Sequence, residues 1–204
     1  MATTQEHRSV DERRDQLVDA ALEVMRHAGL GAVTTRAVTT QAGLPHGSFH
    51  YCFRTKADMF RAVLTRQMRS AMAEAFALST ADLPPAERIV AGLTAHLDRT
   101  RAEPDTALAL LELVALSRRD EMLRGITRWE QGAYIDAVRE HVDQWSTHQN
   151  IRWSAPLEQV ARLLVATADG ISATWLSDRD DAGAATSITL AARTIAALAK
   201  GRTP

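Results

Sequence analysis

The sequence predicts an all-α protein of about nine helices, in which a cluster of three short helices precedes a set of longer ones. Apolar residues recur at the spacing of a helix face along nearly the whole chain. Capping signals precede most of these stretches, and no convincing alternation of apolar and polar residues indicates a strand. The change from short to long helices near Thr55 divides the chain into an N-terminal domain of residues 1–55 and a larger domain of residues 56–204.

The N-terminal domain is expected to contain three helices. A capping box at Ser9 begins the first helix, which ends at Gly29. A second helix is expected over residues 35–42, and Gly43 then turns the chain into a third helix over residues 45–51. A short, compact helical unit is therefore predicted at this end of the chain.

The larger domain is expected to consist of long helices. A capping signal at Thr55 begins a helix with an apolar face that extends to Phe76. Residues 107–116 are apolar almost all round their helix, so we expect them to be buried. The later helices are expected at 85–101, from Pro104, at 119–147, at 156–177, and in an alanine-rich segment that ends near Lys200.

Composition restricts the class of protein. Of the 204 residues, 46% are hydrophobic and 24% are charged, and the net charge is -1, as is ordinary for a globular protein. The single cysteine excludes an internal disulfide and fits a reducing compartment. Because the polar first residues are not a secretory signal and no apolar run could cross a bilayer, we expect a soluble, cytoplasmic protein without a membrane partner.

Positive charge is concentrated around the second and third predicted helices. No acid lies between Glu23 and Asp58, although residues 1–58 are neutral as a whole. The local bias is modest, and by itself it identifies no partner. The cations within this stretch are Arg26, Arg36, Arg54 and Lys56.

Residues 34–53 form the most informative stretch. Two short helices separated by Gly43 would bury small apolar side chains and cross steeply, as in a helix-turn-helix. The second of them would present small and polar side chains of a size that fits the major groove of DNA. A helical hairpin without a ligand satisfies the same spacing, so the spacing alone leaves both interpretations open.

These residues resemble the TetR family of bacterial transcriptional regulators over residues 10–64. The motifs that carry the resemblance are Thr34-Thr35-Arg36-x-Val38, Ala42-Gly43-Leu44, Gly47-Ser48-Phe49, Phe53 and Lys56. The resemblance implies a homodimer that binds a palindromic operator in double-stranded DNA. It also implies a repressor that is released by a small-molecule inducer; an activator or an architectural DNA-binding protein of the same fold is the alternative.

The resemblance also assigns roles to individual residues. The start of the second helix and Lys56 would contact phosphates, the start of the third helix would face base edges, and Phe49 and Phe53 would lie in the core. Thr39 stands where the family usually has alanine, and His50 stands where tyrosine is common. The expected DNA contacts are Thr35, Arg36, Pro45, His46, Gly47, Ser48, His50, Tyr51 and Lys56.

The last two predicted helices are expected to form the dimer interface. They are rich in alanine and joined by a short turn, so they can pack closely as antiparallel neighbours. The resemblance implies a four-helix interface built from two copies of this pair, and a core within one chain is the alternative. The expected interface residues are Leu164, Ala168, Ile171, Ile188, Ala192 and Ile195.

The helices between these two regions are expected to enclose the ligand. Methionine and aromatic side chains suit an adaptable apolar pocket, although they also fill ordinary cores. Glu112 lies within an apolar stretch and would either anchor a ligand or reach solvent. The expected ligand-binding residues are Met68, Met72, Phe76, Leu110, Glu112, Val114, Trp129, Tyr134 and Trp175.

An enzyme is the rejected alternative, and neither a catalytic site, a metal nor a cofactor is expected. Glycine-rich phosphate loops and the Gly-x-Ser-x-Gly and His-Glu-x-x-His motifs are absent from the sequence. The nearest approaches to a metal site are weak, because their side chains do not converge or lack further ligands. They are Glu140-His141-x-Asp143 and the pair His46 and His50.

Overall fold

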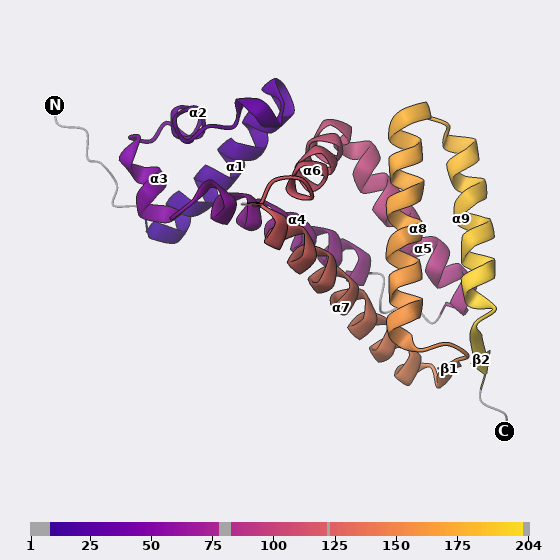
Figure 1. Cartoon of the computed structure of the whole chain (residues 1–204). Helices are drawn as coiled ribbons and strands as arrows, with labels where there is room; N and C mark the ends of the chain where they lie inside the picture. Colours follow the sequence, from indigo (N-terminus) through magenta and orange to yellow (C-terminus); the bar gives the residue numbers. More distant parts are fainter. Residues whose placement is uncertain (1–8, 78–82, 122, 202–204) are drawn as a thin grey trace. The chain divides into compact units, whose positions relative to one another are not determined.

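The computed structural model describes residues 9–77, 83–121 and 123–201. Within these ranges the chain is almost entirely helical, which confirms the all-α prediction (Figure 1). Its elements are α1 (Val10–Ala28), a 3₁₀ turn (Leu30–Ala32), α2 (Thr35–Gln41), α3 (Gly47–Cys52), α4 (Lys56–Ala77), α5 (Pro85–Ala102), α6 (Pro104–Ser117), α7 (Arg124–His148), β1 (Ile151–Trp153), α8 (Leu157–Asp178), α9 (Asp181–Ala196) and β2 (Ala199–Gly201).

The chain forms two compact units. The first unit comprises Met1–Arg66 and Asp105–Thr127, and the second comprises Gln67–Pro104 and Arg128–Pro204. The first unit therefore takes up α6 in addition to the predicted cluster of short helices. The predicted division at residue 55 is based on the change from short to long helices, and it stays a prediction.

Side-chain caps begin the helices of the first unit where the sequence predicts them. The Ser9 hydroxyl accepts a hydrogen bond from the backbone N–H of Glu12 at 3.2 Å, and the Glu12 carboxylate accepts one from the Ser9 N–H at 2.8 Å. The Thr34 hydroxyl accepts from the N–H of Ala37 at 3.0 Å. Gly29 ends α1 with a φ of 77°, in the region that favours glycine.

One apolar core holds α1, α2, α3, the first part of α4 and α6 together. Phe49 and Phe53 are each only 1% exposed, as expected for core residues. Arg14 joins α1 to the end of α3, because its guanidinium donates to the Cys52 carbonyl at 3.0 Å and lies 4.4 Å from the centre of the Phe53 ring. These contacts fix the orientation of α3 within the first unit.

The prediction that residues 107–116 are buried all round is wrong. One face of α6 packs into the core through Ala109 and Leu113, which are 3% and 0% exposed. Leu108 and Leu111, on the other side of the helix, are 50% and 43% exposed in the single chain. An apolar helix can lie at a surface and bury only one face, so its composition does not establish full burial.

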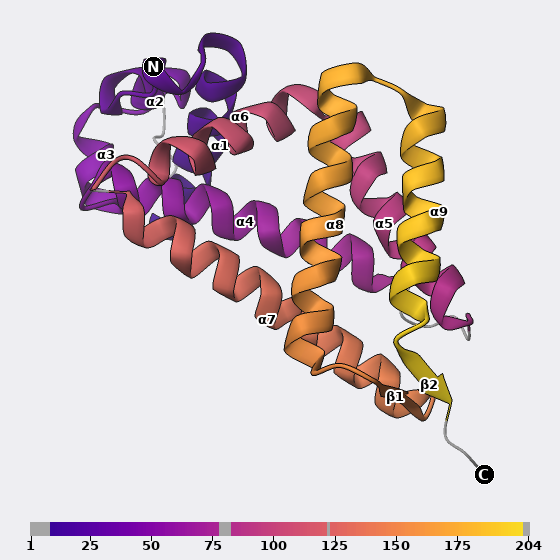
Figure 2. The ribbon, with the colours of Figure 1, turned by 45° about the vertical axis from the view of Figure 1, so that its right-hand side comes forward.

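The second unit is built around an antiparallel pair, α8 and α9, with α5 packed against both (Figures 1 and 2). The Trp175 indole N–H donates to the Asp181 carboxylate at 2.8 Å across the turn between α8 and α9. None of the described helices is both long and apolar enough to span a lipid bilayer.

Three details of the later part of the chain differ from the prediction. A short antiparallel ribbon is present, in which Ile151 pairs with Gly201 and Trp153 pairs with Ala199. Each strand has three residues, too few for an alternating pattern to be recognised. The last helix therefore ends at Ala196 rather than near Lys200, and α7 begins at Arg124 rather than near residue 119.

Candidate functional site

A tight turn joins α2 to α3 in the first unit. Gly43 has a φ of 64°, and the N–H of Leu44 donates to the Thr39 carbonyl at 2.9 Å. Val38 on α2 and Phe49 on α3 are 0% and 1% exposed. The two helices are thus held by an apolar contact on one side, and the opposite side of α3 is left to solvent.

The residues expected to contact DNA come from α2, the turn before α3, α3 and the start of α4, and most of them are exposed. Ser48 and Thr35 are half-buried, and Tyr51 is 68% exposed. Arg54, which was not among the predicted contacts, is exposed just after α3 and adds a cation there. The other exposed members of the predicted set are Arg36, Pro45, His46, Gly47, His50 and Lys56.

Lys56 and Thr39 have defined contacts within the first unit. The Lys56 ammonium donates to the Val33 carbonyl at 3.1 Å and lies 5.5 Å from the centre of the Phe60 ring, so its charge is held at the start of α4. The Thr39 hydroxyl, 1% exposed, donates to the carbonyls of Thr35 and Arg36 at 3.0 and 3.1 Å. The departure from alanine at residue 39 therefore leaves no buried polar atom without a partner.

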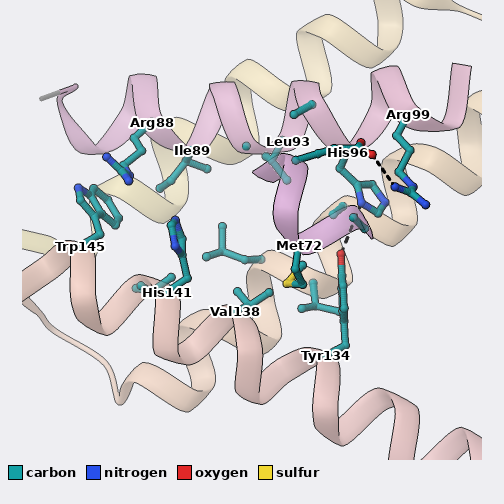
Figure 3. A pocket seen from close by; sticks show the side chains of 18 residues that line it. Met72, Arg88, Ile89, Leu93, His96, Arg99, Tyr134, Val138, His141 and Trp145 are labelled. Atoms are coloured by element: carbon teal, nitrogen blue, oxygen red, sulfur yellow. Dashed lines mark hydrogen bonds and ion pairs between the residues drawn. The ribbon is translucent and has the colours of Figure 1, made fainter. Parts of the chain in front are cut away.

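A cavity of about 120 Å³ lies within the second unit (Figure 3). Side chains from α4, α5, α7 and α8 line it, and polar groups gather at its two ends with an apolar stretch between them. Its lining residues are Ala71, Met72, Glu74, Arg88, Ile89, Gly92, Leu93, Ala95, His96, Arg99, Tyr134, Val138, His141, Val142, Trp145, Leu164, Val165 and Ala168.

Arg88, His141 and Trp145 form one polar end of the cavity (Figure 3). Arg88 is only 8% exposed, and its guanidinium lies 5.1 Å from the centre of the Trp145 ring. Burial lowers the pKa of His141, and the positive charge of Arg88 lowers it further. The indole N–H of Trp145, which is 6% exposed, has no hydrogen-bond partner among the described residues.

The other polar end contains Tyr134, His96 and Arg99 (Figure 3). The Tyr134 hydroxyl lies 3.5 Å from Nδ1 of His96. Burial, and then the charge of Arg99, lower the pKa of His96, while burial raises the pKa of Tyr134. The Arg99 guanidinium donates a hydrogen bond to the side-chain oxygen of Gln67 at 2.6 Å and forms an ion pair with the Glu74 carboxylate at 2.8 Å.

Of the predicted ligand-binding residues, the structure brings Met72 and Tyr134 to the cavity. Leu110 and Val114 pack instead against the core of the first unit, and Glu112 is exposed, which favours the solvent interpretation of that acid. The Phe76 side chain lies outside the described part of the structure.

Three further predicted ligand residues belong to the second unit but do not line the cavity. Met68 is half-buried, Trp129 is 39% exposed, and Trp175 is engaged by Asp181. The polar lining residues of α5 were missed in the sequence. Their signal is the occurrence of Arg88, His96 and Arg99 on the same helical face as Ile89 and Leu93, where apolar side chains are usual.

The predicted dimer residues differ in how far they are buried within the single chain. Ile188, Ala192 and Ile195 are 3%, 0% and 2% exposed within the single chain, so they cannot add contact area with a second copy. Ala168 is likewise buried, and Leu164 and Ile171 are half-buried. The large isoleucines pack inward because α5 covers that side of the helix pair. The outer surface of α8 and α9 instead carries Leu163, Ala166, Gly170, Thr174, Ala185, Thr186 and Leu190.

Comparison with known families and proteins agrees with this architecture. Residues 17–63 match the model of bacterial regulatory proteins of the tetR family, and residues 85–200 match the C-terminal part of BetI-type transcriptional repressors. A curated relative, the HTH-type transcriptional regulator BetI of Rhizobium meliloti (strain 1021), is 30% identical over 112 residues. That alignment spans about half the length of each protein, 55% of this chain and 55% of the relative.

Solved structures share the fold over nearly the whole chain. A TetR-family transcriptional regulator from Rhodococcus sp. has a TM-score of 0.77 at 20% identity and covers 92% of this chain and 98% of its own. The regulator FadR of Bacillus subtilis, solved in complex with stearoyl-CoA, has a TM-score of 0.70 at 16% identity and covers 89% and 97%. The second of the two family matches alone takes in more than half of the residues, so this chain belongs to the TetR family of bacterial regulatory proteins.

Proposed function

We propose that this chain is a ligand-responsive transcriptional repressor that binds a palindromic operator in double-stranded DNA as a homodimer and is released by a small-molecule inducer. The observation that carries the proposal is the exposed polar face of α3 on a buried apolar core, in a chain of the TetR family. The BetI-type repressor match over residues 85–200 supports repression rather than activation.

Readout of DNA is assigned to the first unit. A helix of the size of α3 fits the major groove, where Ser48 and the imidazoles of His46 and His50 can pair with base edges. Thr35 and Arg36 at the start of α2 suit phosphate oxygens, because the first backbone N–H groups of a helix point outward there.

We infer a dimer from the affinity that specific DNA binding requires. One reading unit has few cations, and specific binding at about 10⁻⁸ M or tighter needs two half-sites on one side of the duplex. Leu163 on α8 and Leu190 on α9 are 42% and 59% exposed in the single chain, amid small side chains that allow close helix packing. We assign the dimer interface to this outer face of α8 and α9.

Release by the ligand is a shift between populations of the dimer. A ligand that binds more tightly when the two reading units have the wrong spacing lowers the population that fits the operator. The chain passes from Lys56, at the start of α4, to Met72 in the cavity lining within that one helix. We therefore assign α4 the part of the connecting element.

We further propose that the protein is cytoplasmic and is not an enzyme. An activator or an architectural DNA-binding protein of the same fold is the competing function. An activator would raise transcription from the promoter beside its operator, and an architectural protein would have no defined palindromic site. Transcription from that promoter with and without the protein, in a purified system, separates the repressor from both.

The test is selection of genomic fragments by the purified protein, followed by footprinting of the enriched fragments. We expect a protected inverted repeat whose half-sites are centred about one helical turn apart, or a multiple of it. Absence of enrichment over random DNA contradicts the proposal when the protein is folded and dimeric. Denaturing and refolding the protein before a second selection removes any inducer that was purified with it.

A further inference from the structure

We propose that the cavity of the second unit binds a small monocarboxylate with an apolar body, whose carboxylate is held by Arg88, His141 and the indole N–H of Trp145. The proposal deepens the ligand-responsive function given above and rests on it. It is based on the hydrogen-bonding character, charge and aromatic contacts of the lining side chains, taken in turn below (Figure 3).

The Trp145 indole gives the first argument, because it can only donate a hydrogen bond. The ring is 6% exposed, and its N–H has no partner among the residues that the structure describes. A buried donor without a partner is unfavourable, because it has lost its hydrogen bond to water and gained none in return. The guanidinium of Arg88 beside it is also a donor only. This end of the cavity therefore matches a ligand that supplies acceptor oxygens.

The charge of the lining gives the second argument. Among the described lining residues, the charged side chains are Arg88, Arg99 and Glu74, and Glu74 binds Arg99 at 2.8 Å. Among these described residues, positive side chains outnumber the negative one even when His96 and His141 are neutral, the form that burial favours for both. Among buried side chains, a positive lining favours an anion over a neutral or cationic ligand of the same shape.

The aromatic residues give the third argument, since an aromatic cage for a cation needs uncovered ring faces. The centre of the Trp145 ring lies 5.1 Å from the Arg88 guanidinium and 5.8 Å from the centre of the Trp153 ring. Tyr134 lies at the opposite end of the cavity, beside His96 and Arg99. The Trp145 ring thus already has a cation of this chain against it, which disfavours a cationic ligand.

The apolar stretch between the two ends limits the body of the ligand. Met72, Leu93 and Val138 lie between the polar groups (Figure 3). The cavity of about 120 Å³ is comparable to apolar cavities that accept one benzene molecule. A phenyl ring or a short alkyl chain of about six to eight carbons is therefore the expected body.

Calorimetry with the full-length protein tests the class of ligand with matched probes. Phenylacetate, phenylacetamide and 2-phenylethylamine share one body and differ in charge, and hexanoate, hexanamide and hexylamine form a second series. We expect the better of the two acids to bind about 10-fold more tightly, or more, than its own amide and amine, because only the acid pairs a full negative charge with the Arg88 guanidinium.

Two variants locate the carboxylate. Arg88→Met should weaken acid binding by about 10-fold or more and amide binding by a clearly smaller factor, because the amide carbonyl accepts from Arg88 but carries no charge. Trp145→Phe keeps the ring and removes the N–H, so it should weaken the acid and the amide by a similar factor of about 5. Arg162→Met is the matched control, because Arg162 is exposed on α8 outside the cavity lining, and it should leave all affinities within about 2-fold.

The proposal is overturned if an amine binds as tightly as its acid, if Arg88→Met weakens the acid no more than Arg162→Met does, or if neither acid binds at 10 mM. Operator binding by ligand-free protein is measured in parallel. Operator binding without selectivity for acids leaves the repressor standing and removes the ligand class. Selectivity for acids without operator binding supports the ligand class and removes the repressor.

Discussion

The two units of this chain differ in where their candidate functional groups lie. The first unit carries them on its surface, and the second carries them in its interior. In the first unit the core around Leu17, Val38 and Phe49 is apolar, and the polar residues of α3 are outside it. In the second unit Arg88 is 8% exposed, and it lines a cavity together with His96. A surface that reads DNA needs a rigid support, whereas a site that senses a small molecule has to exclude water.

This difference predicts different responses to mutation. In the first unit, core variants should lower the free energy of unfolding, and surface variants should change DNA binding alone. In the second unit, the same side chains contribute to the interior and to the ligand site, so stability and ligand affinity should change together.

Phe49 and Tyr51, two aromatic residues of α3, should separate stability from DNA binding. Phe49 is 1% exposed and Tyr51 is 68% exposed. Phe49→Ala should lower the free energy of unfolding by about 3–5 kcal/mol, because it leaves a cavity in the core. Tyr51→Ala should change it by about 0.5 kcal/mol or less and still weaken operator binding. Denaturant unfolding and operator titration check both; a large stability loss in Tyr51→Ala contradicts the exposed position of that ring.

Ser48 and Lys56 should differ in what they contribute to DNA binding. Lys56→Ala should weaken binding to all sequences alike and reduce the salt dependence of binding by about one phosphate contact. Ser48→Ala should change base preference at one position of each half-site, by about 1–3 kcal/mol of discrimination. Titration of the operator and its single-base variants at several salt concentrations measures both. Equal loss of base preference in the two variants would count against these roles.

The candidate DNA surface could be predicted from the sequence because it is nearly continuous in the chain. The caps at Ser9 and Thr34 and the turn at Gly43 are local signals, and α3 follows directly from them. The resemblance that implies core positions for Phe49 and Phe53 is carried by the same continuous stretch, and both side chains are buried.

The cavity and the outer helix face could not be predicted in this way, because they are assembled from helices that are distant in the sequence. Arg88 and Trp145 are 57 positions apart in the chain, on α5 and α7, and only tertiary packing brings them together. The inward side of α9 carries Ile188 and Ile195, and from the sequence alone a second copy of the chain could equally have covered them. A helical pattern identifies an apolar face but not the element that packs on it.

Glycine substitutions should separate a turn from a helix interior. Gly43 has a φ of 64°, so Gly43→Ala should lower the free energy of unfolding by about 1–2 kcal/mol. Gly132 lies inside α7 with nothing within 4 Å of an added Cβ, and Gly132→Ala should raise stability by up to about 1 kcal/mol. Thermal unfolding of the two variants measures the contrast; the same sign for both would contradict the backbone geometry at Gly43.

Acid should destabilise the second unit through its buried histidines, which is the smallest effect we expect. Burial lowers the folded-state pKa of His96 and of His141 from 6.5. The unfolded chain therefore takes up these protons first as the pH falls below about 6.5, and stability declines until the folded pKa values are reached. The loss of thermal stability between about pH 7 and pH 5.5 should shrink in His96→Gln and His141→Gln. An unchanged loss in both variants contradicts the burial of these imidazoles.

A titration of operator specificity tests most directly whether α3 reads DNA. The ligand-free dimer is titrated onto the footprinted operator and onto a scrambled duplex of the same length and base composition at physiological salt. We predict that the operator binds about 10³-fold more tightly, or more, and that Ser48→Ala and Tyr51→Ala reduce this ratio. Equal affinity for the two duplexes, from a protein that is folded and dimeric, would contradict the reading of DNA by α3.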